Sequence, residues 1–170
     1  MPGKVSALVL WLFVMNLGIA LGAGLYEGRI VVPQWITSSP GAGAHWHADE
    51  ARRDDTGLKF WAFVSTGPLT VLTIANLVAA RRASGPLRFW WVGGAAVSLV
   101  ERVSTFTYFI PTMVGLIDSP DSAEAVAAAA RWANLNYARH ILVVLAWIAA
   151  LKAFSLLYQT RERQPGTGIR

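Results

Sequence analysis

Residues 5–26 read VSALVLWLFVMNLGIALGAGLY and contain no charged side chain. A helix of about 20 apolar residues crosses the hydrocarbon core of a bilayer, so this stretch is typical of a transmembrane helix. It is longer than the apolar region of a usual signal peptide and no clear cleavage site follows it, so we expect it to be retained. Three further stretches of this kind are found at residues 60–80, 89–110 and 133–158.

The composition of the chain supports a membrane location. Of its 170 residues, 54% are hydrophobic and 15% are charged, with a mean hydropathy of +0.42, whereas average soluble domains carry about 25% charged residues. A water-soluble enzyme and a disordered chain are therefore poor interpretations. The absence of cysteine excludes disulfides, thiolate metal ligands and cysteine nucleophiles. The net charge of +5 does not indicate nucleic-acid binding, because the basic residues are scattered at segment ends.

Charges differ between the two sets of connecting segments. The N-terminus, the second connection and the tail carry Lys4, Arg81, Arg82, Arg88, Arg161, Arg163 and Arg170 against one acid, Glu162. The other two connections hold more acids than bases, so the basic side and both termini are expected in the cytoplasm. The sequence thus predicts one all-α domain, residues 1–170, that forms a four-helix bundle integral to a bacterial inner (plasma) membrane. Outer loops are expected at 27–59 and 111–132, the longer one capping the bundle.

Four ionisable side chains lie inside the predicted spans at one depth. With a rise of 1.5 Å per residue, Glu101 and Arg102 of the third span and Arg139 and His140 of the fourth fall about 12 Å below the outer surface. Such groups are costly within a bilayer and are functional by default. We expect Glu101 to pair with Arg139 or Arg102, and Pro68 to loosen the second helix at the same level.

Helical spacing places these groups on polar faces. A patch on the fourth span comprises Asn136, Arg139 and His140, and residues on the third span recur at intervals of three and four. We expect both faces to point inward and to form a polar pocket; the alternative is a buried ion pair that only sets the helix register. The stripe on the third span consists of Gly94, Ser98, Glu101, Thr105, Tyr108 and Thr112.

The first outer loop contains His45, Trp46 and His47. Two histidines separated by one residue in an extended loop can share a metal ion, with acidic residues nearby as further ligands. The simpler interpretation is a solvated loop with an interfacial Trp. A third is a loop that dips into the bundle and places one histidine above Glu101.

Smaller features predict how the helices pack. Asn16 and Asn76 are expected to form hydrogen bonds between helices, and the Gly-x-x-x-Gly pattern at 18–22, continued by Gly24, to allow close helix approach. Ser122, followed by Ala-Glu-Ala, has the pattern of a helix start with an acidic first turn.

Three short motifs occur in order along the chain. They are Gly22-x-Gly24-x-Tyr26 with Pro33 and Trp35, Tyr108-Phe109-x-Pro111, and Arg131-Trp132-x-x-x-Asn136-x-x-Arg139. With this order and spacing the chain resembles, over nearly its whole length, the anthrone-oxygenase-like family of small four-helix membrane proteins, most of which have no assigned function. The resemblance implies a pocket that opens outward and is lined by Tyr26, Tyr108, Asn136 and Arg139. It also implies oxidation of an anthrone to an anthraquinone by dioxygen without added metal or flavin.

The first functional hypothesis is an oxygenase or oxidoreductase acting with dioxygen on a lipophilic aromatic molecule, anthrone- or phenol-like. His140 or Glu101 would remove a proton, and Arg139 and Asn136 would stabilise the resulting oxyanion. No cofactor is required unless His45 and His47 bind a metal that assists dioxygen. Tyr108 completes the expected catalytic set, and the expected substrate-binding residues are Tyr26, Trp35, Arg102 and Trp132.

The second hypothesis is a non-catalytic membrane protein. It would bind lipid or another membrane protein, and the buried ion pair would secure its fold. A proton-coupled carrier is a weaker interpretation, because four spans form a carrier only as an oligomer. A homo-oligomer is left open by the sequence, whereas nucleic acid is excluded as a partner.

Overall fold

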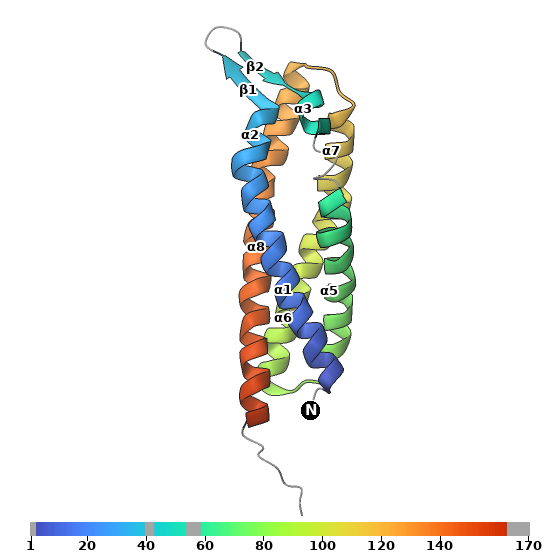
Figure 1. Cartoon of the computed structure of the whole chain (residues 1–170), viewed down its shortest axis with the longest axis vertical. Helices are drawn as coiled ribbons and strands as arrows, with labels where there is room; N and C mark the ends of the chain where they lie inside the picture. The colour runs from blue at the N-terminus through green and yellow to red at the C-terminus, as the bar shows by residue number, and fades with distance from the viewer. Residues whose placement is uncertain (1–2, 40–42, 54–58, 163–170) are drawn as a thin grey trace, which may run out of the picture.

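The computed structural model describes residues 3–39, 43–53 and 59–162. These residues are almost entirely helical and include one two-stranded antiparallel sheet (Figure 1). Among them, three helices are long and apolar enough to cross a membrane: Lys4–Trp35, Phe60–Ala80 and Ala123–Gln159. The first, second and fourth apolar stretches of the sequence are therefore helices of membrane-spanning length, as predicted.

The third predicted span lies within an equally continuous helix that is less apolar. It consists of α6, Gly85–Ser104, the π-helical segment η3, Thr105–Phe109, and α7, Ile110–Ile117. Glu101 and Arg102 lie within α6 and lower its apolar character, and this helix is not among the three that meet the length and hydropathy of a spanning helix. Packing of α6 against neighbouring helices nevertheless buries these two side chains.

The long helical segments lie side by side along the long axis of the molecule (Figure 1). The segment α1, Lys4–Tyr26, packs against α5, Gly67–Ala80, and against α8, Ala123–Glu162; α6 also packs against α5 and α8. The start of α1 and the end of α8 lie at one end of the molecule, and the β-hairpin lies at the other. We call the hairpin end the outer end and the other the inner end.

The apolar core of the inner half contains two of the predicted interhelical hydrogen-bond partners. Asn76 on α5 donates from Nδ2 to the Val9 carbonyl of α1 at 3.3 Å, and its Oδ1 accepts from Trp91 Nε1 of α6 at 2.8 Å. Asn16 on α1 donates to the Val64 carbonyl at 2.9 Å. Both predictions are confirmed. Trp91 is fully buried, and its indole N–H is satisfied by this bond, as a buried Trp requires.

Glycine permits close packing at fewer places than the sequence predicted. A Cβ on Gly18 would lie 3.4 Å from the Trp147 ring, whereas one on Gly22 would meet nothing within 4 Å. The expectation for Gly22 is therefore wrong, because that position of α1 faces open space. Gly94 on α6 makes the close approach instead: its Cβ would lie 3.1 Å from both the Ala146 carbonyl oxygen and the Ala150 nitrogen of α8.

The substitution Gly94→Leu is expected to destabilise the protein by about 1–3 kcal/mol, because the added side chain must push α6 away from the backbone of α8. Gly93→Leu is the matched control, since a Cβ at Gly93 meets nothing within 4 Å. Thermal unfolding in detergent, followed by circular dichroism, measures both variants. Equal midpoints for the two variants would show that the close approach at Gly94 does not matter for stability.

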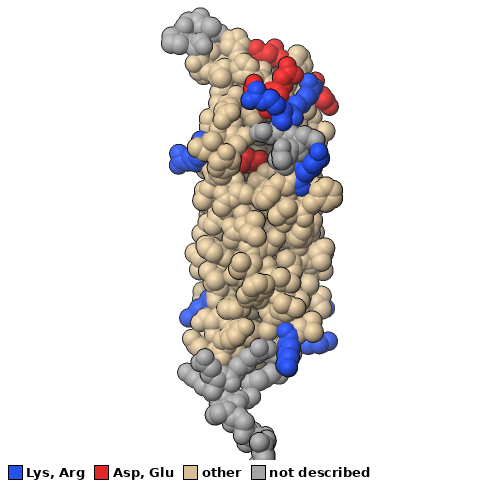
Figure 2. Space-filling model, viewed as in Figure 1, with Lys and Arg blue, Asp and Glu red and all other residues tan. Residues whose placement is uncertain are grey.

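The middle of the molecule exposes an apolar surface. Figure 2 shows charged residues only toward the two ends of the face drawn, with basic residues at the inner end and both signs at the outer end. Large side chains such as Phe63 (79% exposed), Val71 (67%) and Ile141 (60%) cover the band between them. Water-soluble monomers rarely expose continuous apolar patches beyond a few hundred Å², so this band is compatible with a surface that faces a membrane.

At the outer end the helices are longer than predicted. After Tyr26 the chain continues through η1, the π-helical segment Glu27–Val31, and α2, Val32–Trp35, so the predicted loop at 27–59 is wrong for its first nine residues. The predicted loop at 111–132 is also wrong, because α7 extends to Ile117 and α8 begins at Ala123. Ser122 starts α8 as expected: its Oγ accepts a hydrogen bond from the Ala125 amide at 3.1 Å.

Prolines explain both errors. Each of the helices α2, α5 and α7 has a proline (Pro33, Pro68 or Pro111) at its first or second position and follows a π-helical segment. The wider π turn accommodates the missing N–H and the pyrrolidine ring, which would otherwise clash with the preceding turn. The segment before Pro68 is η2, Phe60–Thr66, which confirms the predicted loosening of the second helix. The prolines therefore widen the helices without ending them.

The described residues of the first outer loop beyond Trp35 fold as a cap. It consists of β1, Ile36–Ser39, β2, Gly43–Trp46, and α3, Ala48–Arg53. Trp46 is buried (3% exposed), meets the Trp35 ring edge-on at 6.5 Å, and donates from Nε1 to the Leu116 carbonyl at 3.1 Å. The Trp132 ring lies on Trp35 at a tilted angle, with 6.2 Å between the two ring centres. The capping role predicted for this loop is thus observed, whereas the interpretation of Trp46 as part of a solvated loop is wrong.

Candidate functional site

Five polar side chains form a buried group between α6 and α8, which we call the buried polar cluster. They are nearly inaccessible, with exposed fractions of 1% for Glu101, 5% for Arg102, 2% for Asn136, 11% for the Arg139 side chain and 6% for His140. The cluster lies below the cap and next to the π-helical segment η3. π-Helical turns occur frequently at functional sites.

The Glu101 carboxylate is held mainly by its neighbour in the chain. Arg102 donates from Nε to Oε2 and from Nη2 to Oε1, each at 2.6 Å, and Thr105 Oγ1 donates to Oε1 at 3.0 Å. Arg139 Nε lies 3.9 Å from Oε1. Both predicted pairings are therefore present, the one with Arg102 being a tight bidentate pair.

Arg139 extends from α8 across the outer half of the molecule. Its guanidinium carbon lies 4.8 Å from the centre of the Phe109 ring and 5.8 Å from that of Trp61. Aromatic faces at these distances attract a cation and leave its N–H groups available. Trp61 is itself fixed, because its Nε1 donates to a carboxylate oxygen of Glu27 at 2.7 Å. The sequence motifs gave no sign of this Glu27–Trp61 support.

His140 faces α1. A Cβ on Gly24 would lie only 2.4 Å from His140 Nε2, and one on Gly28 would lie 3.8 Å from Cε1. The imidazole therefore occupies the space left by a missing side chain on α1. The sequence indicates only a packing role for Gly24, because no pattern within one helix indicates which side chain of another will meet a glycine.

Several hydrogen-bonding atoms of the buried polar cluster are unpaired. Asn136 Nδ2 and Oδ1, Arg139 Nε, both ring nitrogens of His140 and Arg102 Nη1 have no hydrogen-bond partner among the residues that the structure describes. More than 90% of buried polar groups in proteins are paired, and each unpaired one costs about 1–3 kcal/mol. Such a concentration of unpaired donors and acceptors is a feature of buried positions that hold water, an ion or the polar part of a ligand.

The structure does not bring every predicted site residue to the cluster. Tyr108 is half-buried and packs edge-on against Phe109 at 5.2 Å, one residue from the ring that contacts Arg139. Tyr26 is 63% exposed, so its ring does not line the cluster. Trp35 and Trp132 belong to the aromatic core of the cap, where Trp132 Nε1 donates to the Phe109 carbonyl at 3.0 Å.

The two histidines of the cap have separate partners. His45 Nδ1 donates to an Asp121 carboxylate oxygen at 2.8 Å, and His47 Nε2 lies 2.6 Å from Thr37 Oγ1. In residues 3–39, 43–53 and 59–162, no group of three or more His, Cys, Asp or Glu side chains is arranged to hold a metal ion. Because both histidines are held in the cap, the interpretation that places one of them above Glu101 is wrong.

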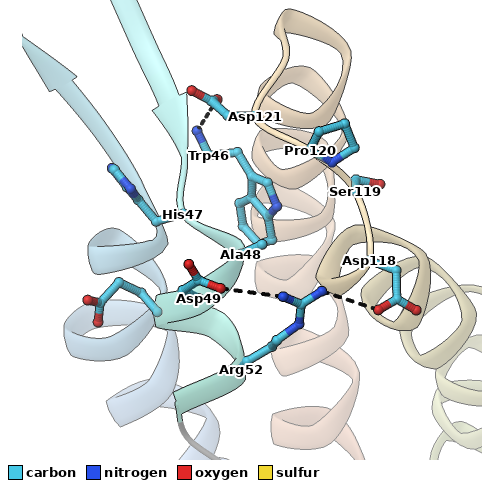
Figure 3. A pocket seen from close by; sticks show the side chains of 10 residues that line it. Trp46, His47, Ala48, Asp49, Arg52, Asp118, Ser119, Pro120 and Asp121 are labelled. Carbon is cyan, nitrogen blue, oxygen red and sulfur yellow. Dashed lines mark hydrogen bonds and ion pairs between the residues drawn. The ribbon is translucent and has the colours of Figure 1, made fainter.

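Two surface pockets lie away from the buried polar cluster. One, of about 610 Å³, lies in the cap, where Arg52 reaches toward Asp49 and Asp118 at 3.4 Å each (Figure 3). The other, of about 430 Å³, lies at the start of α6 near the inner end. Neither is lined by a residue of the cluster.

Asp121 ties the cap to the segment that precedes α8. Its carboxylate accepts hydrogen bonds from His45 Nδ1 and from the Trp46 amide, each at 2.8 Å. These bonds hold the pKa of Asp121 below its ordinary value of 3.8. Because the folded state favours the ionised form, the contribution of Asp121 is complete above pH 3.8 and is lost as the pH falls below it.

Acidification below this value is therefore expected to lower the amide hydrogen-exchange protection of residues 43–46, and Asp121→Asn to lower it already at neutral pH. Asp118→Asn is the control, since Asp118 contacts Arg52 at the same surface but does not bond to the hairpin. Hydrogen exchange read by mass spectrometry gives both results. Protection that does not differ between the two variants would contradict the anchoring role of Asp121.

No family model matches the chain, and no curated protein and no solved structure shows significant similarity to it. The residues of the three sequence motifs nevertheless have definite places. Asn136 and Arg139 belong to the buried polar cluster, Phe109 contacts Arg139, and Trp35 and Trp132 pack in the cap.

Proposed function

We propose that the protein is a four-helix integral membrane protein of the plasma membrane, with its inner end and both termini in the cytoplasm. Three helices of spanning length and the exposed apolar band support this placement. The charges at the inner end support the orientation, because basic residues predominate in cytoplasmic segments. In this arrangement the buried polar cluster lies within the hydrocarbon region, on the outer side.

Within that membrane placement, we propose an oxidoreductase that uses dioxygen to oxidise a lipophilic aromatic molecule of the anthrone or phenol type. One observation carries the proposal: Asn136, Arg139 and His140, close together on α8, bury hydrogen-bonding atoms that no described residue satisfies. The resemblance to the anthrone-oxygenase-like family leads to the same chemistry. The substrate, like dioxygen, would enter from the lipid phase.

The proposed reaction begins with proton removal. His140 takes a proton from the activated CH₂ group of the substrate, and the negative charge that develops on the substrate oxygen is stabilised by Arg139 Nε and Asn136 Nδ2. Glu101 does not compete for Arg139 strongly, because its carboxylate is held by Arg102 at 2.6 Å, against 3.9 Å to Arg139. The Arg139 guanidinium therefore remains available to hydrogen-bond to the substrate.

Oxidation completes the reaction with dioxygen as the sole oxidant. The substrate anion gives electrons to dioxygen and forms a carbon–oxygen bond, and the resulting peroxide anion takes the proton from His140 to give a hydroperoxide at the former CH₂ carbon. His140 then removes the second hydrogen from that carbon as a proton, the O–O bond breaks, and a carbonyl group forms. The departing hydroxide takes up this second proton from His140, so one dioxygen is consumed and one water is produced for each CH₂ converted to C=O.

Oxygen uptake tests this proposal. Wild-type protein in lipid nanodiscs is expected to accelerate dioxygen consumption by anthrone over empty nanodiscs, with one dioxygen used per anthraquinone formed. Arg139→Ala is expected to lower the rate by about 10²- to 10³-fold, the usual effect of losing one oxyanion donor. Ile141→Ala, an exposed neighbour on α8, is the control. Equal rates for wild type, Arg139→Ala and empty nanodiscs would refute the proposal.

A second candidate is a non-catalytic membrane protein in which the cluster only secures the fold. Two observations favour it. Glu101 and Arg102 form a bidentate pair, and neither of the two surface pockets is lined by a residue of the cluster. It predicts that function survives neutralisation of both Glu101 and Arg139, since a neutral pair avoids the cost of a lone buried charge.

Elemental analysis tests a further alternative, in which a metal assists the reaction. A stoichiometric metal that is lost in His45→Ala and His47→Ala would indicate metal-assisted chemistry.

A further inference from the structure

The inner end carries a groove that the proposed reaction does not use. It has a volume of about 430 Å³ and is lined by Gly85, Arg88, Phe89, Val92 and Gly93. These residues are three or four apart, so they share one face of α6. From Gly85 to Gly93 the groove follows the helix for about 12 Å, at 1.5 Å per residue.

Two glycines leave the groove open. Gly85 has a φ of +58°, in the left-handed region, which allows the chain to turn sharply into α6 without a side chain at that point. A Cβ on Gly93 would meet nothing within 4 Å, so the other end of the groove is also unfilled. Phe89 (71% exposed) forms a wall between them and meets the Trp90 ring edge-on at 5.6 Å.

The residues that line the groove become less polar with distance from the inner end. Of the described residues that line it, Arg88 alone is charged; it lies near the inner end, while Val92 and Gly93 lie one turn further toward the apolar band. Among the described residues Arg88 has no ion-pair partner, in contrast to Arg52 and Arg102, which do. A planar guanidinium with free N–H groups is well suited to bind a phosphate through two hydrogen bonds.

We infer that this groove binds one anionic phospholipid of the cytoplasmic leaflet, with its phosphate on Arg88 and an acyl chain along Phe89, Val92 and Gly93. The sequence of charge, aromatic ring and apolar surface matches the order of headgroup, interface and chain in such a lipid. The inference rests on the proposed membrane placement and is independent of the chemistry at the buried polar cluster.

Native mass spectrometry tests the inference on protein taken from nanodiscs that contain equal amounts of phosphatidylglycerol and phosphatidylcholine. Wild type is expected to retain one phosphatidylglycerol in preference to phosphatidylcholine. Arg88→Gln is expected to reduce this preference about fivefold, the effect of one basic side chain at an anionic membrane surface. Gly93→Leu is expected to reduce it similarly, because leucine fills the groove.

Two matched variants serve as controls. Arg82→Gln removes a charge from the same end without touching the groove, and Gly22→Leu adds a leucine where a Cβ meets nothing within 4 Å, on α1. Both should retain the wild-type preference. An equal loss in Arg82→Gln and Arg88→Gln would overturn the inference in favour of diffuse attraction, and displacement of the lipid by inorganic phosphate would overturn it in favour of a free-phosphate site.

The lipid groove and the oxidation reaction remain separately testable. Arg88 and Gly93 lie near the inner end, away from His140 and Arg139, so their variants are expected to oxidise anthrone at the wild-type rate. Loss of lipid preference with unchanged oxygen uptake therefore supports the groove alone. If Arg88→Gln retains phosphatidylglycerol as wild type does, the groove is not the lipid site. This conclusion holds whatever the measured rate of anthrone oxidation.

Discussion

Replacement of His140 by alanine is expected to slow anthrone oxidation by about 10²- to 10⁴-fold, the usual contribution of a positioned general base. The imidazole is the best-placed base of the buried polar cluster, because both its nitrogens lack a hydrogen-bond partner among the described residues. Glu101, the other candidate, already accepts bonds from Arg102 and Thr105. The measurement is oxygen uptake in nanodiscs, with product formation read by absorbance.

A second variant displaces the imidazole without removing it. In Gly24→Ala the added methyl group would lie 2.4 Å from His140 Nε2, so the ring must move. We expect this variant to lose much of the rate while retaining its helical content. Gly22→Ala is its control, because that Cβ meets nothing within 4 Å. If His140→Ala oxidises anthrone as fast as wild type, the base is not His140 and the proposed reaction fails at its first step.

The second prediction concerns the free energy of unfolding, which depends on the buried Glu101 carboxylate. Glu101→Gln removes the negative charge that neutralises Arg102 and lies near Arg139, and leaves the buried Arg102 guanidinium without its bonded counter-ion. Breaking a buried ion pair in this way costs about 3–5 kcal/mol. Unfolding in mixed detergent micelles, followed by circular dichroism, measures the loss. Glu124→Gln is the control, an exposed acid on α8 that should change the free energy of unfolding by less than about 0.5 kcal/mol.

A double variant shows whether the loss is due to an unpaired charge. Adding Arg102→Gln to Glu101→Gln removes the positive partner as well, so much of the lost stability should return. Double-mutant analysis is suited to this pair, because the two side chains bond directly to each other. Equal stability of Glu101→Gln and Glu124→Gln would contradict the view that the pair is buried and desolvated.

The sequence predicted the helices and the level of the ionisable residues, for clear physical reasons. Uncharged runs of about 20 residues have few alternatives to a spanning helix. A constant rise per residue then allowed depth to be calculated, and the 3.9 Å separation of Glu101 and Arg139 across two helices agrees with it. Polar spacing on α6 likewise predicted the inward face that buries Ser98, Glu101 and Thr105.

Two helix ends and one contact between helices were not predicted. Pro33 and Pro111 have the pattern of helix breakers, yet each follows a π turn that lets the helix continue. Arg102 is one of the two partners predicted for Glu101, although neighbours one position apart do not face each other on a helix. The contact of His140 with Gly24 joins residues of two helices, and only the packed structure reveals it.

The most direct test of a ligand site in the buried polar cluster combines binding and stability in one variant. Asn136→Leu keeps the size of the side chain and removes two buried hydrogen-bonding atoms that lack partners. We predict that it unfolds at a higher temperature than wild type and binds an anthraquinone at least tenfold more weakly in nanodisc equilibrium dialysis, since a polar group kept for a ligand is costly without it. A variant that binds anthraquinone as wild type does, or that is less stable, would contradict the account.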